Sequence, residues 1–432
     1  MHCTITAAVS EANVRLPRSL SLLYAAGFLR SLGVGLLGVV LAVYLSRVGV
    51  SATGIGLVIG AGLLGACIAT AVVAFGSLRI GHRASLVTLS LLAALGGLAL
   101  ASLPSFPLLL LLAFVGMVNG MGTDRSAAFA LEQAIIPGLV PDRSRTWGLS
   151  WYNALLDSGG AIGALGAGLP LATSRFAHIS LIGSYGYLFI AYALLQVANA
   201  ILYLLLPADV GLSQPVPPSL SERAPSAQDR SIVHRISALF AVDAFGGGFL
   251  TDALVSYWFF HRFGLTEQTL GWLFFVVHVL NACSHLGAAW IAQRIGLVNT
   301  MVFTHLPSSL FLIAVPFASS SSWAIALFLL RETFVEMDVP TRQSYVAALG
   351  EPIERPYASG ITNITRTGAW AAASSLSGFI MQRVAFSAPL VIGGTLKIVY
   401  DVVLYRNFRH LKPPEERIAK TIEFQSTHNV GR

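Results

Sequence analysis

Long apolar stretches separated by short polar connections run along almost the whole chain. A helix needs about 20 apolar residues to cross the hydrocarbon core of a membrane. Twelve segments meet this length, at 20–46, 52–75, 84–103, 107–131, 146–171, 182–206, 236–260, 267–292, 299–318, 323–346, 357–382 and 387–408. Lipid cannot satisfy backbone polar groups, and these runs are too long and too unalternating for barrel strands. We therefore predict an all-α, polytopic membrane protein with twelve transmembrane helices.

The predicted helices divide into two similar halves. Segment 207–235 contains five prolines and several serines without helical or strand periodicity, which is typical of a flexible linker. On either side of it the sequence repeats at an offset of about 215, as in Arg79-Ile80-Gly81 and Arg294-Ile295-Gly296. Such a repeat indicates two bundles related by an axis along the membrane normal. The predicted order is an N-terminal segment (1–19), a six-helix bundle (20–206), the linker (207–235), a second six-helix bundle (236–408) and a tail (409–432).

The composition excludes several other classes of protein. Hydrophobic residues make up 55% of the chain and charged residues 11%, whereas soluble chains carry about 25% charged residues. Cys3, Cys67 and Cys283 are too few and too scattered for a disulfide framework or a zinc site. The net charge of +7 comes from Lys and Arg spread in ones and twos, so no nucleic-acid partner is expected. The sequence contains no Walker A motif, and we expect neither a cofactor nor a bound metal.

The distribution of basic residues predicts the orientation in the membrane. With the N-terminus in the cytoplasm, the connections on that side carry eighteen Lys and Arg residues. The opposite side carries only Arg47, Arg175, Arg262 and Arg383. Cytoplasmic loops of membrane proteins are enriched in Lys and Arg. We therefore place both termini in the cytoplasm and the protein in a plasma membrane, such as a bacterial inner membrane.

Two short segments resemble motifs of the major facilitator superfamily of secondary transporters. Residues 74–83 keep the later glycine and the last basic residue of the signature G-x-x-x-D-x-x-G-R-[KR], but Leu78 replaces its aspartate. Gly159 and Gly163 keep the glycine spacing of the drug-antiporter motif, with Ala164 in place of its proline. The twelve-helix architecture is similar to this family over essentially the whole chain. The resemblance implies a monomeric transporter rather than an enzyme, with alternating access to a central cavity between the bundles.

Ionisable residues inside the predicted helices are the main candidates for a functional site. Charges within hydrocarbon are costly and usually mark a substrate or ion pathway, although structural ion pairs are the alternative. Helices 3, 6 and 9 contain no Asp, Glu, Lys or Arg, whereas helices 1, 4, 7 and 10 each contain at least one. In the superfamily these four helices line the central cavity. The candidates on them are Arg30, Asp124, Arg125, Asp243, Asp252, Arg331, Glu332, Glu336 and Asp338.

Three other helices carry further candidates for the substrate or proton pathway. His278 and His285 share one stripe of helix 8. Packing and proton or substrate handling are the main alternatives for this pair, because metal binding would need ligands from elsewhere. Asp157 on helix 5 follows aromatic residues that suit a cationic or amphipathic ligand. Arg366 on helix 11 suits an anionic group, or the neutralisation of an acid across the interface.

Two structural ion pairs are also expected from position alone. Glu132 lies at the cytoplasmic end of helix 4, where a conformational latch with Arg79 or Arg83 is predicted. Lys397 and Asp401 are four residues apart on helix 12 and are expected to neutralise each other.

The leading functional hypothesis is proton-coupled efflux of a small organic or amphipathic compound. Desolvation favours the neutral form of a carboxylic acid, and alternating access changes that desolvation. An alternative is an uptake carrier for a metabolite or organic anion, which Arg30, Arg125, Arg331 and Arg366 would bind. A remote alternative is a non-transporting membrane receptor. The partners expected for the leading hypothesis are a small-molecule substrate, protons and membrane lipid.

Overall fold

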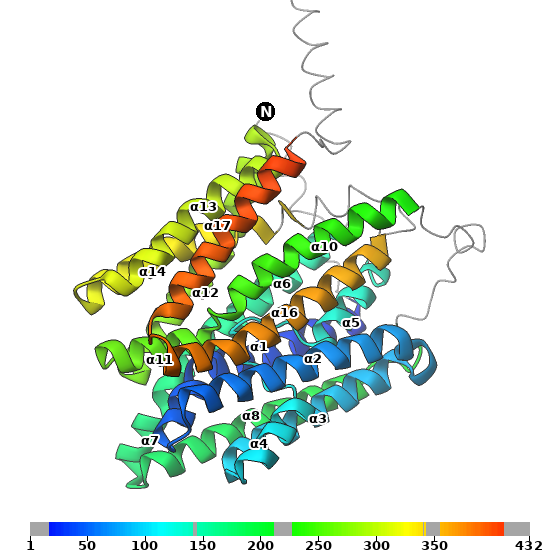
Figure 1. Cartoon of the computed structure of the whole chain (residues 1–432). Helices are drawn as coiled ribbons and strands as arrows, with labels where there is room; N and C mark the ends of the chain where they lie inside the picture. Colours follow the sequence, from blue (N-terminus) through cyan, green and yellow to red (C-terminus); the bar gives the residue numbers. More distant parts are fainter. Residues whose placement is uncertain (1–16, 141–144, 211–226, 340, 343–354, 410–432) are drawn as a thin grey trace, which may run out of the picture.

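The computed structural model describes residues 17–140, 145–210, 227–339, 341–342 and 355–409. Within these ranges the chain is built from helices, and no strand occurs (Figure 1). The first half comprises α1 (Arg18–Arg47), α2 (Ala52–Ile80), α3 (His82–Ser102), α4 (Phe106–Val115), α5 (Ala127–Ile135), α6 (Arg145–Leu165), α7 (Leu169–Ala177) and α8 (Leu181–Leu204). The second half comprises α10 (Ala227–Gly248), α11 (Asp252–Phe263), α12 (Glu267–Ile295), α13 (Leu297–Ala314), α14 (Ser321–Val335), α16 (Arg355–Arg383) and α17 (Ala388–Phe408).

The described helices follow one another in the order expected for twelve crossings. Among the described residues, nine helices or helix pairs are long and apolar enough to span a membrane. The three remaining crossings depart from this simple form: α4 and α5 are separated by an irregular segment, α14 is short and α16 is rich in polar residues. The predicted all-α fold of two six-helix bundles is therefore confirmed.

The two ends of the molecule are named here by the chain termini. The end at which α1 begins and α17 ends is the terminal face, and the opposite end is the distal face. The linker expected over 207–235 lies mostly outside the described residues. Its last part is helical, because α10 already begins at Ala227.

The internal repeat appears in the structure as matched turns. Helices α2 and α12 are both 29 residues long, and each is followed by a glycine with positive φ, Gly81 at 91° and Gly296 at 87°. Gly49 and Gly264 likewise adopt positive φ just after α1 and α11. Glycine takes this backbone conformation without steric cost. The repeat in the sequence therefore reflects equivalent loop geometry in the two halves.

The fourth and seventh crossings are both interrupted, and the two interruptions meet. Residues 116–126 between α4 and α5 leave the helical path, although a continuous helix over 107–131 was expected. The side chain of Asn119 bonds the backbone of Met121 and Thr123, which competes with helical bonding. At the start of α11 the backbone N–H of Ala253 donates to the carbonyl oxygen of Gly120 at 3.1 Å. A backbone hydrogen bond thus joins the two halves.

Small residues allow α2 and α16 to pack closely across the interface between the halves. Figure 1 shows α16 beside α2. A Cβ atom added to Gly56 would lie 2.7 Å from the carbonyl oxygen of Ser374, and one added to Gly378 would lie 2.1 Å from that of Ala52. Only glycine permits such an approach of the two backbones.

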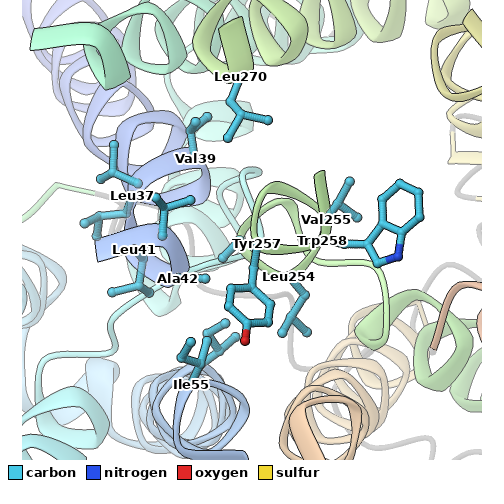
Figure 2. Close-up of a cluster of buried hydrophobic side chains, with 14 of the residues drawn as sticks. Leu37, Val39, Leu41, Ala42, Ile55, Leu254, Val255, Tyr257, Trp258 and Leu270 are labelled. Carbon is cyan, nitrogen blue, oxygen red and sulfur yellow. The ribbon is translucent and has the colours of Figure 1, made fainter. Parts of the chain in front are cut away.

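A large apolar core fills the distal half of the interface. Figure 2 shows Leu41 and Ala42 of α1 near Leu254 and Tyr257 of α11, with Ile55 of α2 close by. All of these side chains are buried. The core therefore separates the middle of the molecule from the distal face.

Polar contacts at the distal face join the same two halves, and we call them the distal clasp. Arg47 at the end of α1 pairs with Glu267 at the start of α12, with 2.6 Å between Nε and Oε1. The hydroxyl of Tyr185 on α8 donates to the same carboxylate at 2.5 Å. The hydroxyl of Ser46 is 2.7 Å from Nε2 of His261. The distal face is consequently closed in this structure.

Candidate functional site

A cavity between the halves gathers most of the ionisable residues singled out in the sequence. It encloses about 740 Å³ of empty space, part of it open to solvent. Most of its wall comes from the second half, and the segment between α4 and α5 supplies the contribution of the first half. The predicted site residues that line it are Arg125, Asp243, Asp252, His278, Arg331, Glu332, Glu336, Asp338 and Arg366.

Asp243 on α10 is the centre of a buried ion-pair network. Its Oδ1 atom accepts a hydrogen bond from Lys397 Nζ at 2.8 Å. Its Oδ2 atom lies 3.4 Å from Arg342 Nη1 and 3.6 Å from Arg366 Nη1. Arg342 also pairs with Asp338 at 2.5 Å. Removing one partner from such a network leaves an uncompensated charge, so these pairs hold α10, α16 and α17 together.

The acidic residues of the cavity differ in whether they form an ion pair with a Lys or Arg side chain. Glu332 pairs with its neighbour Arg331, and Asp338 is held by Arg342. Asp252 and Glu336 form no ion pair with Lys or Arg among the described residues. The nearest basic group to Asp252 is His278, with 3.8 Å between Oδ2 and Nε2. These two acids are therefore free to exchange a proton or to contact a ligand.

Two arginines from opposite halves face one aromatic ring in the cavity. The guanidinium carbon of Arg366 lies 5.0 Å from the ring centroid of Trp370, and that of Arg125 lies 6.0 Å from it. The Nε atom of Arg125 and the Nη1 atom of Arg366 are buried without a hydrogen-bond partner among the described residues. This arrangement provides two donors to an anionic group.

A second group of unsatisfied polar atoms lies on α11 and α12. Oδ2 of Asp252, Nε2 of His278 and Oδ1 of Asn281 are buried and lack a hydrogen-bond partner within the described ranges. His278 and Asn281 lie about one helical turn apart on α12, and both line the cavity. Buried polar groups are normally hydrogen-bonded, so these atoms are candidates for ligand contacts.

Asp157 and His285 form a pair across the interface instead of lining the cavity. Oδ2 of Asp157 on α6 lies 3.9 Å from Nε2 of His285 on α12. Both side chains are close enough to Glu336 to interact with its charge. In the described part of the chain, no three His, Cys, Asp or Glu side chains are grouped so that they could hold a metal ion.

Arg30 and Asp124 do not line the central cavity, which corrects the expectation that both do. Nε of Arg30 bonds Asp124 at 2.6 Å, and Nη2 bonds Glu132 at 2.5 Å inside the first half. The hydroxyl groups of Tyr152 and Tyr203 complete the network with bonds to Glu132 of 2.5 and 2.7 Å. The long arginine side chain reaches acids on the fourth crossing of its own half, so the cluster is a structural unit of that half.

The predicted latch between Glu132 and the basic residues after α2 is absent from this structure. Glu132 is fully buried and is bound to Arg30. Arg83 donates to the carbonyl oxygen of Leu206 at 3.2 Å, and Arg79 is exposed. The expectation fails because the side chain of Glu132 points into the first half rather than to the loop that follows α2.

The expected pair of Lys397 and Asp401 is also wrong. Lys397 bonds Asp243, whereas Asp401 accepts a hydrogen bond from Nδ1 of His305 at 2.9 Å. Lys397 and His305 line the cavity but were left out of the predicted site. Lys397 is the only lysine within a predicted span. The isolation of this lysine marks it as a candidate, and His305 lies on helix 9, which carries no Asp, Glu, Lys or Arg to draw attention to it.

Comparisons with known proteins agree with this architecture. A model of the Major Facilitator Superfamily matches residues 23–330 and 236–428. An uncharacterized membrane protein of Saccharomyces cerevisiae is 25% identical over 417 residues, covering 90% of this chain and 93% of the yeast protein.

Two solved transporters share the fold. A partially occluded, inward-open xylose transporter from E. coli superposes with a TM-score of 0.72 at 15% identity, over 90% of this chain and 97% of that chain. A D-xylose-proton symporter superposes with a TM-score of 0.70 at 14% identity, over the same shares of the two chains. The protein is thus an integral membrane protein and a secondary transporter rather than an enzyme, and it belongs to the Major Facilitator Superfamily.

Proposed function

We propose that the protein is a proton-coupled transporter of a small, polar organic solute, which binds in the central cavity and moves by alternating access. Secondary transport follows from the family, whereas the coupling ion and the solute class are our proposal. The observation that carries it is Glu336, a cavity acid without an ion pair among the described residues and with charges from both halves around it.

The surroundings of Glu336 suit a proton carrier. Arg125 of the first half and His285, Arg331 and Arg342 of the second half are close enough to interact with its charge. Alternating access moves the halves relative to each other, so the charges around Glu336 change in every cycle. A carboxylate in such a place takes up and releases a proton as its charged form is made less or more favourable.

The cavity wall favours a polar solute. Drug-sized ligands usually bind in pockets with mainly apolar walls. Here five acids and five bases stand on the lining, with two histidines. The sequence predicts efflux of the solute, driven by protons that move inward, and this direction of transport stays a prediction. The same cavity would serve uptake if proton and solute moved together.

Purified protein in proteoliposomes that contain a pH-sensitive dye tests the proposal. A panel of sugars, nucleosides, amino acids, dipeptides and carboxylates is offered with a pH gradient of either sign. We expect at least one polar solute to move protons, and the sign of the gradient that drives accumulation gives the direction of transport. If solute moved without any proton movement, proton coupling would be wrong.

Glu336→Gln tests the assigned carrier. Because glutamine imitates the protonated acid, the variant should lose gradient-driven accumulation and keep exchange of labelled solute at equal concentrations. Asp209→Asn, which neutralises an exposed acid near the terminal face, is the matched control and should behave as the wild type. Undiminished accumulation by Glu336→Gln would exclude Glu336 as the coupling group.

A further inference from the structure

We propose that the solute is a zwitterion, whose cationic amino group binds at Asp252, His278 and Asn281 and whose anionic group binds between Arg125 and Arg366. This inference rests on the proposed function and names the chemical class of its solute. Both groups of residues line the same cavity.

The amino end of the site is built from three atoms that can accept a hydrogen bond, Nε2 of His278 doing so in the tautomer with its proton on Nδ1. A primary ammonium group has three N–H donors, and Oδ2 of Asp252, Nε2 of His278 and Oδ1 of Asn281 are three buried atoms without a partner in the described part of the chain. The side chain of His278 is 3% exposed, and its Nε2 atom lies 3.8 Å from Oδ2 of Asp252. An ammonium group between these atoms would satisfy all three.

The position of Asp252 is fixed by the interruption of the seventh crossing. Thr251 caps α11, since its hydroxyl accepts a hydrogen bond from the N–H of Leu254 at 3.3 Å. Asp252 is the next residue, and its side chain packs against Gly122 of the first half. A Cβ atom at position 122 would lie 1.7 Å from Oδ2 of Asp252 and would displace this carboxylate, and Gly122 also has a positive φ of 83° that favours glycine.

The anionic end of the site is built from two donors and an aromatic face. Nε of Arg125 and Nη1 of Arg366 are the buried, unpartnered donors, and Trp370 lies beside both guanidinium groups. Two donors match the two oxygen atoms of a carboxylate. The Nη1 atom of Arg366 is 3.6 Å from Oδ2 of Asp243, so an acid already offsets part of its charge. Arg125 forms no such ion pair among the described residues.

The balance of charge selects a zwitterion over an ion of one sign. Within the described residues, Asp243 and Asp338 are matched by Lys397 and Arg342, and Glu332 is matched by Arg331. The lining charges left over are those of Asp252, Glu336 and Arg125 and the surplus positive charge that Arg366 brings to the network of Asp243, and together they sum to zero. A ligand with a net charge would leave one charge uncompensated in a buried site, which is costly. A zwitterion would not.

Matched probes test the inference. Alanine, γ-aminobutyrate and the dipeptide alanyl-alanine carry both charges, whereas their N-acetyl derivatives lack the ammonium group and their amides lack the carboxylate. Binding is measured on the purified full-length protein from ligand-dependent increases in the unfolding temperature. We expect at least one zwitterion to bind about 10- to 100-fold more tightly than either of its blocked derivatives, the range for losing one hydrogen-bonded charge.

Two variants should alter the preference at one end of the ligand only. Asp252→Asn should bind the zwitterion and its N-acetyl derivative equally, and should still prefer the free carboxylate to the amide. Arg125→Gln should bind the zwitterion and its amide equally, and should still prefer the free ammonium group to the N-acetyl derivative. A purely structural role for either residue would lower the affinity for all probes alike, and this outcome would contradict the assignment.

Failure of the inference can be told apart from failure of the proposed function. If none of the three zwitterions raised the unfolding temperature, or if the blocked derivatives did so equally, the zwitterion class would be wrong. Proton movement driven by a sugar or nucleoside would then leave proton-coupled transport standing. If a zwitterion bound to the protein but moved no protons in proteoliposomes, proton coupling would be refuted. The proposed binding site for the zwitterion would still be supported.

Discussion

Neutralising the carboxylate of the distal clasp should open the distal face of the transporter. In Glu267→Gln the amide keeps a hydrogen bond from Tyr185 but loses its charge opposite Arg47. The contact is short, at 2.6 Å, and the side chain of Glu267 is only 5% exposed. The variant therefore weakens a contact that is made between the halves only while the distal face is closed.

The size of the effect follows from the burial of the two partners. A hydrogen bond to a charged group contributes about 1.5–3 kcal/mol. The side chain of Arg47 is 30% exposed, so solvent screens part of the attraction, and about 1–2 kcal/mol is the expected loss. One to two kcal/mol corresponds to a roughly 5- to 30-fold change in the ratio of closed to open molecules.

Distances between spin labels on the distal ends of the halves measure this ratio. Ser105 and Ser319 are exposed there on opposite halves, and cysteines at both positions carry the labels in a background without native cysteines. We expect Glu267→Gln to increase the fraction of long distances. Arg383→Gln is the matched control, because Arg383 is an exposed distal residue without an ion pair among the described residues. An unchanged distribution, or an equal shift in the control, would refute the role of the clasp.

Three further variants test other parts of the structure. Glu132→Gln should destabilise the first half by about 3 kcal/mol, seen as a lower unfolding temperature, because its buried arginine partner loses one of two acids; it should leave the label distances unchanged. Gly56→Ala should separate α2 from α16 and lengthen distal distances, whereas Gly54→Ala, whose Cβ meets side chains of its own half, should not. A cysteine replacing Asp209 should react only with reagents admitted to the cytoplasm and one replacing Ser319 only from outside, and the reverse pattern would invert the predicted orientation.

The membrane-spanning pattern was readable from the sequence because each crossing needs a long apolar run. The repeat was also visible in the sequence, and its glycines Gly81 and Gly296 are required by the backbone conformation that ends α2 and α12. The break in the fourth crossing was missed. The sequence is mainly apolar on both sides of the break, and helical spacing does not show that the side chain of Asn119 bonds the backbone and redirects it.

The partners of the buried charges were much harder to predict. Helical spacing shows which residues share a face, but it does not show how each helix is rotated against its neighbours. Lys397 therefore bonds Asp243, which is 154 residues away in the chain, rather than Asp401, which is four residues away. Glu132 similarly finds Arg30 within its own half. Expected residues line the cavity where whole helices face the centre, whereas Arg30 and Glu132 lie elsewhere because a single long side chain decides their contact.

The backbone hydrogen bond between the interrupted crossings has a consequence for how this protein can diverge. The N–H of Ala253 and the carbonyl oxygen of Gly120 belong to the main chain, so no substitution at either position removes these groups, proline at 253 excepted. Side-chain size is restricted instead, because a Cβ atom at position 120 would lie 3.1 Å from that of Ala253. Homologous chains can thus vary the charges that line the cavity, and so their solutes, while keeping the same joint between the halves, provided that both positions stay small.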